Sequence, residues 1–86
     1  PAGRCIALRR DEYLAFEELI MLGHLDDDAQ RDAAASGGYL NAAEARETAG
    51  DVSRMKRHVA DLRAARERLE TKRDKMLRDL GAQAVE

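Results

Sequence analysis

The chain has few of the residues that interrupt helices or build chemical sites. Proline occurs once in 86 residues, at position 1, so proline breaks no later helix. Cys5 is the lone cysteine, which excludes an internal disulfide and argues against a cysteine-ligated zinc site. Tryptophan is absent and aromatic residues make up 3%, so a core must be built mainly from small and aliphatic side chains.

Long apolar runs are also missing. No run is longer than four residues, as at 19–22, which is far too short to cross a bilayer, and no signal peptide is recognisable. A lone cysteine suits a reducing compartment. We therefore expect a cytoplasmic protein that has no membrane partner.

Helix-forming residues are abundant instead. Charged residues reach 37%, and Ala, Arg, Glu and Leu dominate the composition. Residues 1–50 carry five basic and ten acidic side chains, whereas residues 51–80 carry ten basic and six acidic ones. We predict a single all-α domain over residues 1–86. Its split charge favours head-to-tail or antiparallel association, or an acidic partner for the basic half.

Residues 1–38 are predicted to form an N-terminal segment and a short helical head. A helix over residues 11–22 would end at Gly23, and the aspartates at 26–28 would cap a second helix over residues 27–35. Ser36, Gly37 and Gly38 would break that helix. The first helix is apolar around most of its circumference, so its side chains are expected to form the core. The predicted core residues are Leu14, Phe16, Leu19, Ile20 and Leu22.

Residues 39–80 are predicted to form a long helical arm, followed by a frayed tail over residues 81–86. Asn41 and Glu44 resemble a capping box, Gly50 allows either a bend or a continuous helix, and Gly81 ends it. Residues 51–80 contain neither proline nor glycine and would extend roughly 45 Å as a helix. A 12-residue helix in the head spans only about 18 Å, so most of the arm is expected to project from it.

The arm carries an apolar 3-4 repeat that is typical of a coiled-coil seam. With Val52 at position a, all four d positions are apolar, whereas Arg66 and Arg73 occupy a positions and would help to fix register or partner choice. For residues 52–62, the alternative is that the helix folds back over the head. The predicted partner-binding residues are Met55, Val59, Leu62, Arg66, Leu69, Arg73, Met76 and Leu80.

These patterns lead to the hypothesis of a small non-enzymatic protein–protein interaction module. Such a protein would act as an adaptor, inhibitor or assembly component, and it would pair with itself, as a dimer, or with another helical protein. We expect Leu62→Asp together with Leu69→Asp to abolish association and to leave the head helical.

No residue pattern in the chain predicts catalysis or metal binding. Cys5, Ser36 and Ser53 lie outside any nucleophile motif. Residues 26–28 are consecutive aspartates, whereas calcium loops place their ligands at alternate positions. His24 and His58 lack a second ligand at helical spacing, so we predict no metal and no cofactor.

The sequence RCIALRRDE (residues 4–12), followed by an apolar helix that ends at Gly23, resembles the opening of ribbon-helix-helix DNA-binding proteins. The resemblance implies a strand over residues 3–10 that pairs across a dimer and presents Cys5, Ala7 and Arg9 to the major groove. The acidic residues 26–28 depart from the family, because they would repel the DNA backbone where a phosphate anchor is expected. A dimeric DNA-binding transcriptional regulator is the alternative function.

Overall fold

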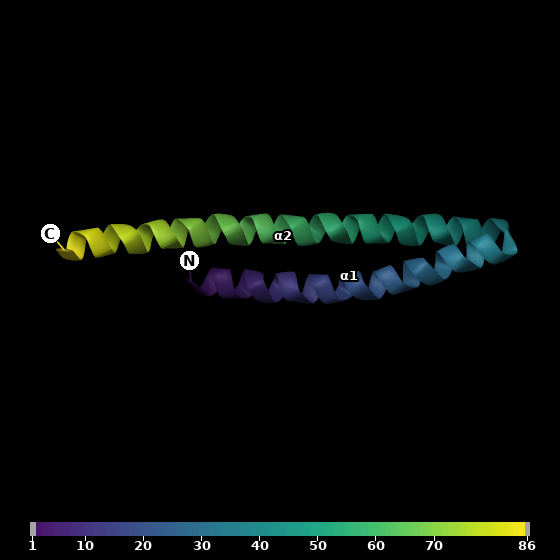
Figure 1. Cartoon of the computed structure of the whole chain (residues 1–86), viewed down its shortest axis with the longest axis horizontal. Coiled ribbons are helices and arrows are strands. Elements are labelled where there is room, and N and C mark those ends of the chain that lie inside the picture. The colour runs from purple at the N-terminus through teal and green to yellow at the C-terminus, as the bar shows by residue number, and fades with distance from the viewer. Residues whose placement is uncertain (1, 86) are drawn as a thin grey trace.

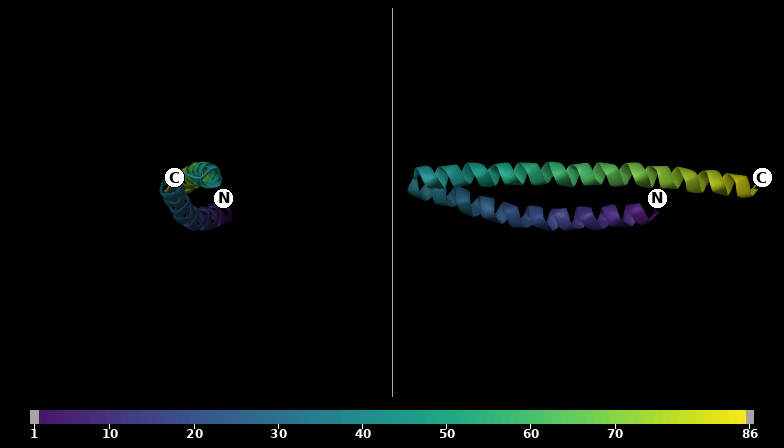
Figure 2. Two further views of the ribbon diagram at one scale, coloured as in Figure 1. Left: turned by 90° about the vertical axis from the view of Figure 1, so that its right-hand side faces the viewer. Right: turned by 180° about the vertical axis from the view of Figure 1, so that it is seen from behind.

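The chain folds into an antiparallel helical hairpin. In the computed structural model, α1 (Ala2–Ser36) and α2 (Tyr39–Val85) lie side by side along the length of α1 (Figure 1). The structure describes the backbone of residues 2–85 and the side chains of residues 2–83. Seen from the end, one helix lies beside the other with no third layer (Figure 2). The molecule measures 73 × 14 × 13 Å and is therefore a rod.

The prediction of an all-α fold is confirmed, because no strand occurs among residues 2–85. The prediction of a short two-helix head with one long arm is wrong, because α1 has 35 residues and α2 has 47. Residues 3–8 are helical, and Cys5 and Leu8 are buried three positions apart. The ribbon that the DNA-binding resemblance implies therefore has no counterpart in residues 3–10.

Gly23 and the aspartates at 26–28 do not interrupt α1, contrary to the prediction. A glycine inside a helix costs about 1 kcal/mol relative to alanine, which packing along the rest of a long helix can outweigh. Asp26 does not cap a helix. Its Oδ1 accepts hydrogen bonds from Gln30 Nε2 at 3.1 Å and from Thr48 Oγ1 of α2 at 3.0 Å. Side-chain partners thus hold an acidic group between the helices where the local sequence indicated a helix start.

One continuous 3-4 repeat explains why α1 is a single helix. Its residues, which we call the α1 seam, are all buried or half-buried and face α2. The α1 seam consists of Cys5, Leu8, Glu12, Ala15, Leu19, Leu22, Asp26, Ala29 and Ala33. When the α1 seam is numbered as a heptad with Cys5 at position a, its residues alternate between a and d positions. They pack against the a and d residues of α2. Small alanines near the turn allow the two backbones to approach closely.

The chain reverses at Gly37 and Gly38, so the break predicted there is confirmed. Gly37 has φ +62°, a left-handed conformation that favours glycine, and its N–H donates to the carbonyl of Ala33 at 2.9 Å. The predicted capping box at Asn41 and Glu44 is wrong, because α2 already begins at Tyr39. The carbonyl of Gly38 accepts its first hydrogen bond, from Ala42 N–H at 3.0 Å.

The C-terminal part of α2 extends beyond α1. α2 continues through Gly50 and Gly81, and the predicted tail of residues 81–86 is helical as far as Val85, with residue 86 outside the described part. At 1.5 Å per residue, α2 is roughly 18 Å longer than α1 and projects past the N-terminus (Figure 1). No helix within residues 2–85 combines the length and apolar content that a membrane span requires.

Two glycine substitutions are expected to change stability in opposite directions. Gly37→Ala should lower the free energy of unfolding by about 1 kcal/mol, because alanine is strained at φ +62°. Gly23→Ala should raise it by about 0.5–1 kcal/mol, because Gly23 is helical and nothing lies within 4 Å of an added Cβ. Urea unfolding followed by circular dichroism measures both. A stabilising Gly37→Ala would contradict the turn geometry.

Candidate protein-binding surface

The structure divides the predicted partner-binding residues of α2 into two groups. Val59 is buried, and the members from Met55 to Arg73 other than Val59 are half-buried at positions that face α1. Met76 and Leu80 lie near the projecting end of α2 and are 46% and 60% exposed. Most of the predicted seam therefore packs within the hairpin, as the fold-back alternative proposed for residues 52–62. Only its last two apolar residues remain largely open to an outside partner.

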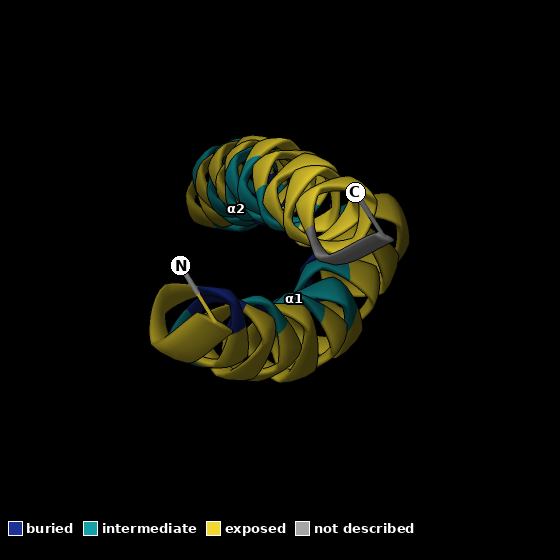
Figure 3. Cartoon of the chain, turned by 90° about the vertical axis from the view of Figure 1, so that its left-hand side faces the viewer, coloured by how far each residue is buried: buried dark blue, intermediate teal, exposed yellow. Residues whose placement is uncertain are grey.

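A second apolar surface lies on α1, beside the α1 seam. Tyr13, Phe16 and Ile20 follow one another at helical spacing, and Ile6 lies one heptad before Tyr13. Their exposed fractions are 70% for Ile6, 62% for Tyr13, 47% for Phe16 and 45% for Ile20. We call these four residues the outer stripe. These fractions leave much of the outer stripe open in the single chain, in which exposed residues make up most of both helices (Figure 3).

The outer stripe is the larger of two exposed apolar groups on α1. The other group consists of Leu14, Met21 and Leu25. By helical periodicity it lies on the opposite flank of α1, and the charged residues Arg10 and Glu17 separate the two groups. Two of the three aromatic side chains of the chain belong to the outer stripe.

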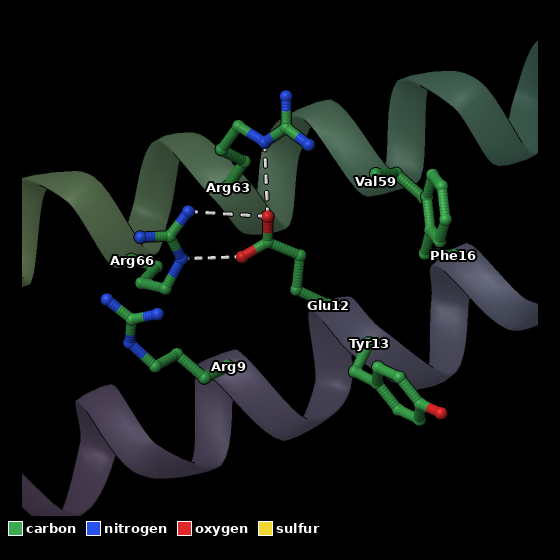
Figure 4. Close-up of a pocket in the computed structure, with 7 residues that line it drawn as sticks. All are labelled: Arg9, Glu12, Tyr13, Phe16, Val59, Arg63 and Arg66. Carbon is green, nitrogen blue, oxygen red and sulfur yellow. Dashed lines mark hydrogen bonds and ion pairs between the residues drawn. The ribbon is translucent and has the colours of Figure 1, made fainter.

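A groove of about 300 Å³ runs between the outer stripe and α2. Phe16 extends toward Val59 at one end of it, and Tyr13 points away from α2 (Figure 4). Three guanidinium groups border the other end, those of Arg9, Arg63 and Arg66. An aromatic ring beside an aliphatic floor and a basic edge is suited to receive apolar side chains with a carboxylate nearby.

Glu12 anchors the basic end of the groove from position a of the α1 seam. Its carboxylate accepts hydrogen bonds from Arg66 Nε at 2.5 Å, Arg63 Nε at 3.1 Å and Arg66 Nη2 at 3.3 Å (Figure 4). Glu70 extends the network, with Oε2 3.0 Å from Arg66 Nη1 and Oε1 2.8 Å from Arg9 Nε. Three guanidinium groups and two carboxylates therefore form one ion-pair network across the two helices.

The network fixes how the helices are aligned. The side chains of Glu12, Arg66 and Glu70 are each 15% exposed, so removing one partner would leave a charge poorly solvated. Sliding one helix by a heptad would set Glu12 against Val59 or Arg73 and leave Arg66 opposite an apolar residue. The pairing of Arg66 with Glu12 is therefore specific to the observed alignment of the two helices. That Arg66 and Arg73 fix register or partner choice, as their a positions predict, stays a prediction.

The network also makes the stability of the hairpin depend on acid. The hydrogen bond from Arg66 lowers the pKa of Glu12 below its ordinary value; partial burial opposes this shift and the hydrogen bond from Arg63 adds to it. The same hydrogen bond to Glu12 raises the pKa of Arg66. A lowered folded-state pKa stabilises the fold fully above the unfolded pKa of about 4.3, and this contribution is lost as the pH falls through the folded pKa.

Glu12→Gln is expected to flatten the acid side of the stability profile. Between about pH 5 and pH 3, the variant should lose less stability than the wild type, because it has no carboxylate at position 12 to protonate. Urea titrations at each pH measure this slope. Glu18→Gln is the control, since Glu18 is exposed and forms no ion pair among the described side chains. Equal slopes for Glu12→Gln and wild type would show that the pair does not stabilise the fold.

The remaining candidate residues do not converge on a chemical site. His24 and His58 are exposed on different helices, and Cys5 is 2% exposed inside the hairpin. No group of three His, Cys, Asp or Glu side chains within the described residues has the arrangement of a metal site. What the described surface offers is apolar contact with a charged border.

The sequence did not indicate the outer stripe as a surface, because two of its four residues are predicted there to belong to the core. Phe16 and Ile20 were predicted to be buried, yet 47% and 45% of their surfaces are exposed. The available signal was the width of the apolar surface on residues 11–22, which exceeds what one neighbouring helix covers.

Comparison of the chain with protein-family models, with curated proteins and with solved structures returns no match.

Proposed function

We propose that this chain is a non-enzymatic protein–protein interaction module that binds a helical polypeptide through the outer stripe of α1. The bound helix is either a second copy of the chain or part of another protein. The end of α2 that projects past α1, which carries Met76, Leu77 and Leu80, extends the binding surface. The partner-binding role predicted for Met76 and Leu80 is kept in this proposal.

The surface area of the chain carries the proposal. The hairpin exposes 6523 Å², whereas a compact 9.6 kDa protein exposes about 5,100 Å². The excess, on the order of 1,400 Å², exceeds the roughly 800 Å² that each partner buries in a standard interface. The radius of gyration is 20.3 Å against about 12 Å for a compact domain of this length. A two-helix rod of this shape gains most by packing against further helices.

The composition of the outer stripe supports the same function. Tyr13 and Phe16 are the residue types enriched at the centres of protein interfaces, and Ile6 and Ile20 extend the contact on either side. A helix that is apolar around most of its circumference is normally buried on more than one side. α2 covers the α1 seam and part of Phe16, so the rest of the outer stripe is available for a partner.

The two tyrosines provide the test. In a Tyr39→Phe protein, Tyr13 is the only tyrosine and lies in the outer stripe; in a Tyr13→Phe protein, only Tyr39 at the hairpin turn remains. Association should reduce acrylamide quenching of Tyr13 by about twofold or more and leave quenching of Tyr39 unchanged.

The measurement is made on purified chain over a range of concentrations and on any complex that a tagged chain retains from cell extract. Shielding of Tyr13 in either sample supports binding through the outer stripe. Tyr13 that stays as accessible as Tyr39, which is 79% exposed, in both samples would overturn the proposal.

A further inference from the structure

We infer that the partner of the outer stripe is a second copy of this chain, with the two α1 helices antiparallel and a twofold axis beside Tyr13. This inference rests on the proposed function and specifies its partner. It requires a surface that is complementary to itself, because a twofold axis places the same patch on both sides.

The spacing of the outer stripe meets this requirement. Ile6, Tyr13 and Ile20 are each seven residues apart, so Tyr13 lies at the midpoint. In an antiparallel pair centred there, Ile6 of one copy faces Ile20 of the other at both ends, and the two tyrosines meet at the axis. Every apolar residue of this row then has an apolar partner in the second copy.

The charges beside the outer stripe favour the same arrangement. Arg9 and Arg10 precede Tyr13, and Glu17 follows it at nearly equal distance. Antiparallel pairing places Arg10 of one copy across from Glu17 of the other, twice by symmetry, and Arg9 near the ring of Phe16. The nearest intrachain ion pair of Arg10 is with Asp11 at 3.8 Å, and Glu17 makes none among the described side chains. Both are therefore available for a partner.

Other pairings fit less well. A parallel pair would place Arg10 of one copy beside Arg9 of the other, which is repulsive, and would set Glu17 beside Phe16 without a basic partner. An antiparallel pair through the opposite flank, with Leu14 facing Leu25, would bring Asp11 close to Asp28 of the other copy. The outer stripe is thus the flank of α1 on which both the apolar side chains and the charges match their own copies.

Single cysteines in a Cys5→Ala background test the geometry. Tyr13→Cys should form a disulfide-linked dimer by itself at least about tenfold faster than Ile6→Cys or Ile20→Cys alone, because only a residue at the axis meets its own copy. Mixing the Ile6→Cys and Ile20→Cys proteins should produce a crosslinked pair of the two. Arg68→Cys, exposed on α2, measures the rate of random collision.

Each other pattern of crosslinks overturns the inference. Self-crosslinking of all three stripe variants would indicate parallel pairing, and rates no higher than that of Arg68→Cys would indicate that the second copy does not bind here. If Tyr13 is nevertheless shielded in the fluorescence experiment, the proposed function stands and only the identity or orientation of the partner is wrong.

A charge exchange provides a second readout that does not depend on cysteine chemistry. Arg10→Glu and Glu17→Arg should each weaken the dimer about tenfold, and the double variant should return to within about threefold of wild type. An additive loss in the double variant would contradict the facing of Arg10 and Glu17.

Discussion

Aspartate at both Leu62 and Leu69 is expected to unfold the whole hairpin. Both leucines are half-buried at d positions of α2 that face α1, so two carboxylates would enter the interface that joins the helices. The expected loss is about 4 kcal/mol or more, comparable with the total stability of a small domain. Circular dichroism should show most of the helix signal lost at 25 °C.

Ser53→Asp with Ala60→Asp is the matched control. These residues have the same seven-residue spacing on the same helix, add the same charge and are exposed. The control should remain helical, with a loss of about 1 kcal/mol from helix propensity alone. The sequence alone predicts that the leucine pair abolishes association and leaves the head helical. A helical double variant that no longer associates would therefore favour that earlier interpretation over the hairpin.

Lysine at Tyr13 and Ile20 is expected to abolish association and to leave the hairpin folded. Both side chains lie on the outer stripe, 62% and 45% exposed, so the charges are solvated in the single chain and are buried only in the complex. Because each copy contributes both sites, the dissociation constant should rise by about 100-fold or more. Sedimentation velocity measures association, and circular dichroism verifies the fold.

Leu14→Lys with Met21→Lys is the control on the opposite flank of α1. This pair has the same seven-residue spacing and comparable exposure, 56% and 63%, and should change the dissociation constant by less than about threefold. The reverse result, with this pair disruptive and the stripe pair neutral, would show that the binding surface is the flank of Leu14 and Met21 and not the outer stripe.

The helical content and the turn were predictable because their signals are local. A chain with one proline, many alanines and alternating charges favours helix everywhere, and Gly37 and Gly38 supply the left-handed residue that a reversal needs. The length of α1 was not predictable in this way. Gly23 and the aspartates at 26–28 indicate a stop and a start, and the interactions that override them come from α2.

The packing of most of the α2 seam against α1 was not predictable, because periodicity does not say which surface covers a seam. Met55, Val59 and Leu62 have the pattern of an exposed coiled-coil face, but they pack against residues 12–22 of α1. The part of the arm beyond residue 62 is covered because α1 already begins at Ala2, so that Arg9 reaches Glu70.

A charged residue at a core position gave the missing clue. Glu12 in the α1 seam and Arg66 in α2 would each be a poorly solvated charge without a partner, whereas together they form an ion pair. Their complementarity identifies the two helices as neighbours.

The most direct test of pairing between hairpins is sedimentation equilibrium of the purified wild-type chain over a range of concentrations. The account predicts a mass that rises from 9.6 kDa toward twice that value, and a Tyr13→Lys, Ile20→Lys protein that stays at 9.6 kDa. A wild-type chain that remains at 9.6 kDa up to its limit of solubility would contradict it.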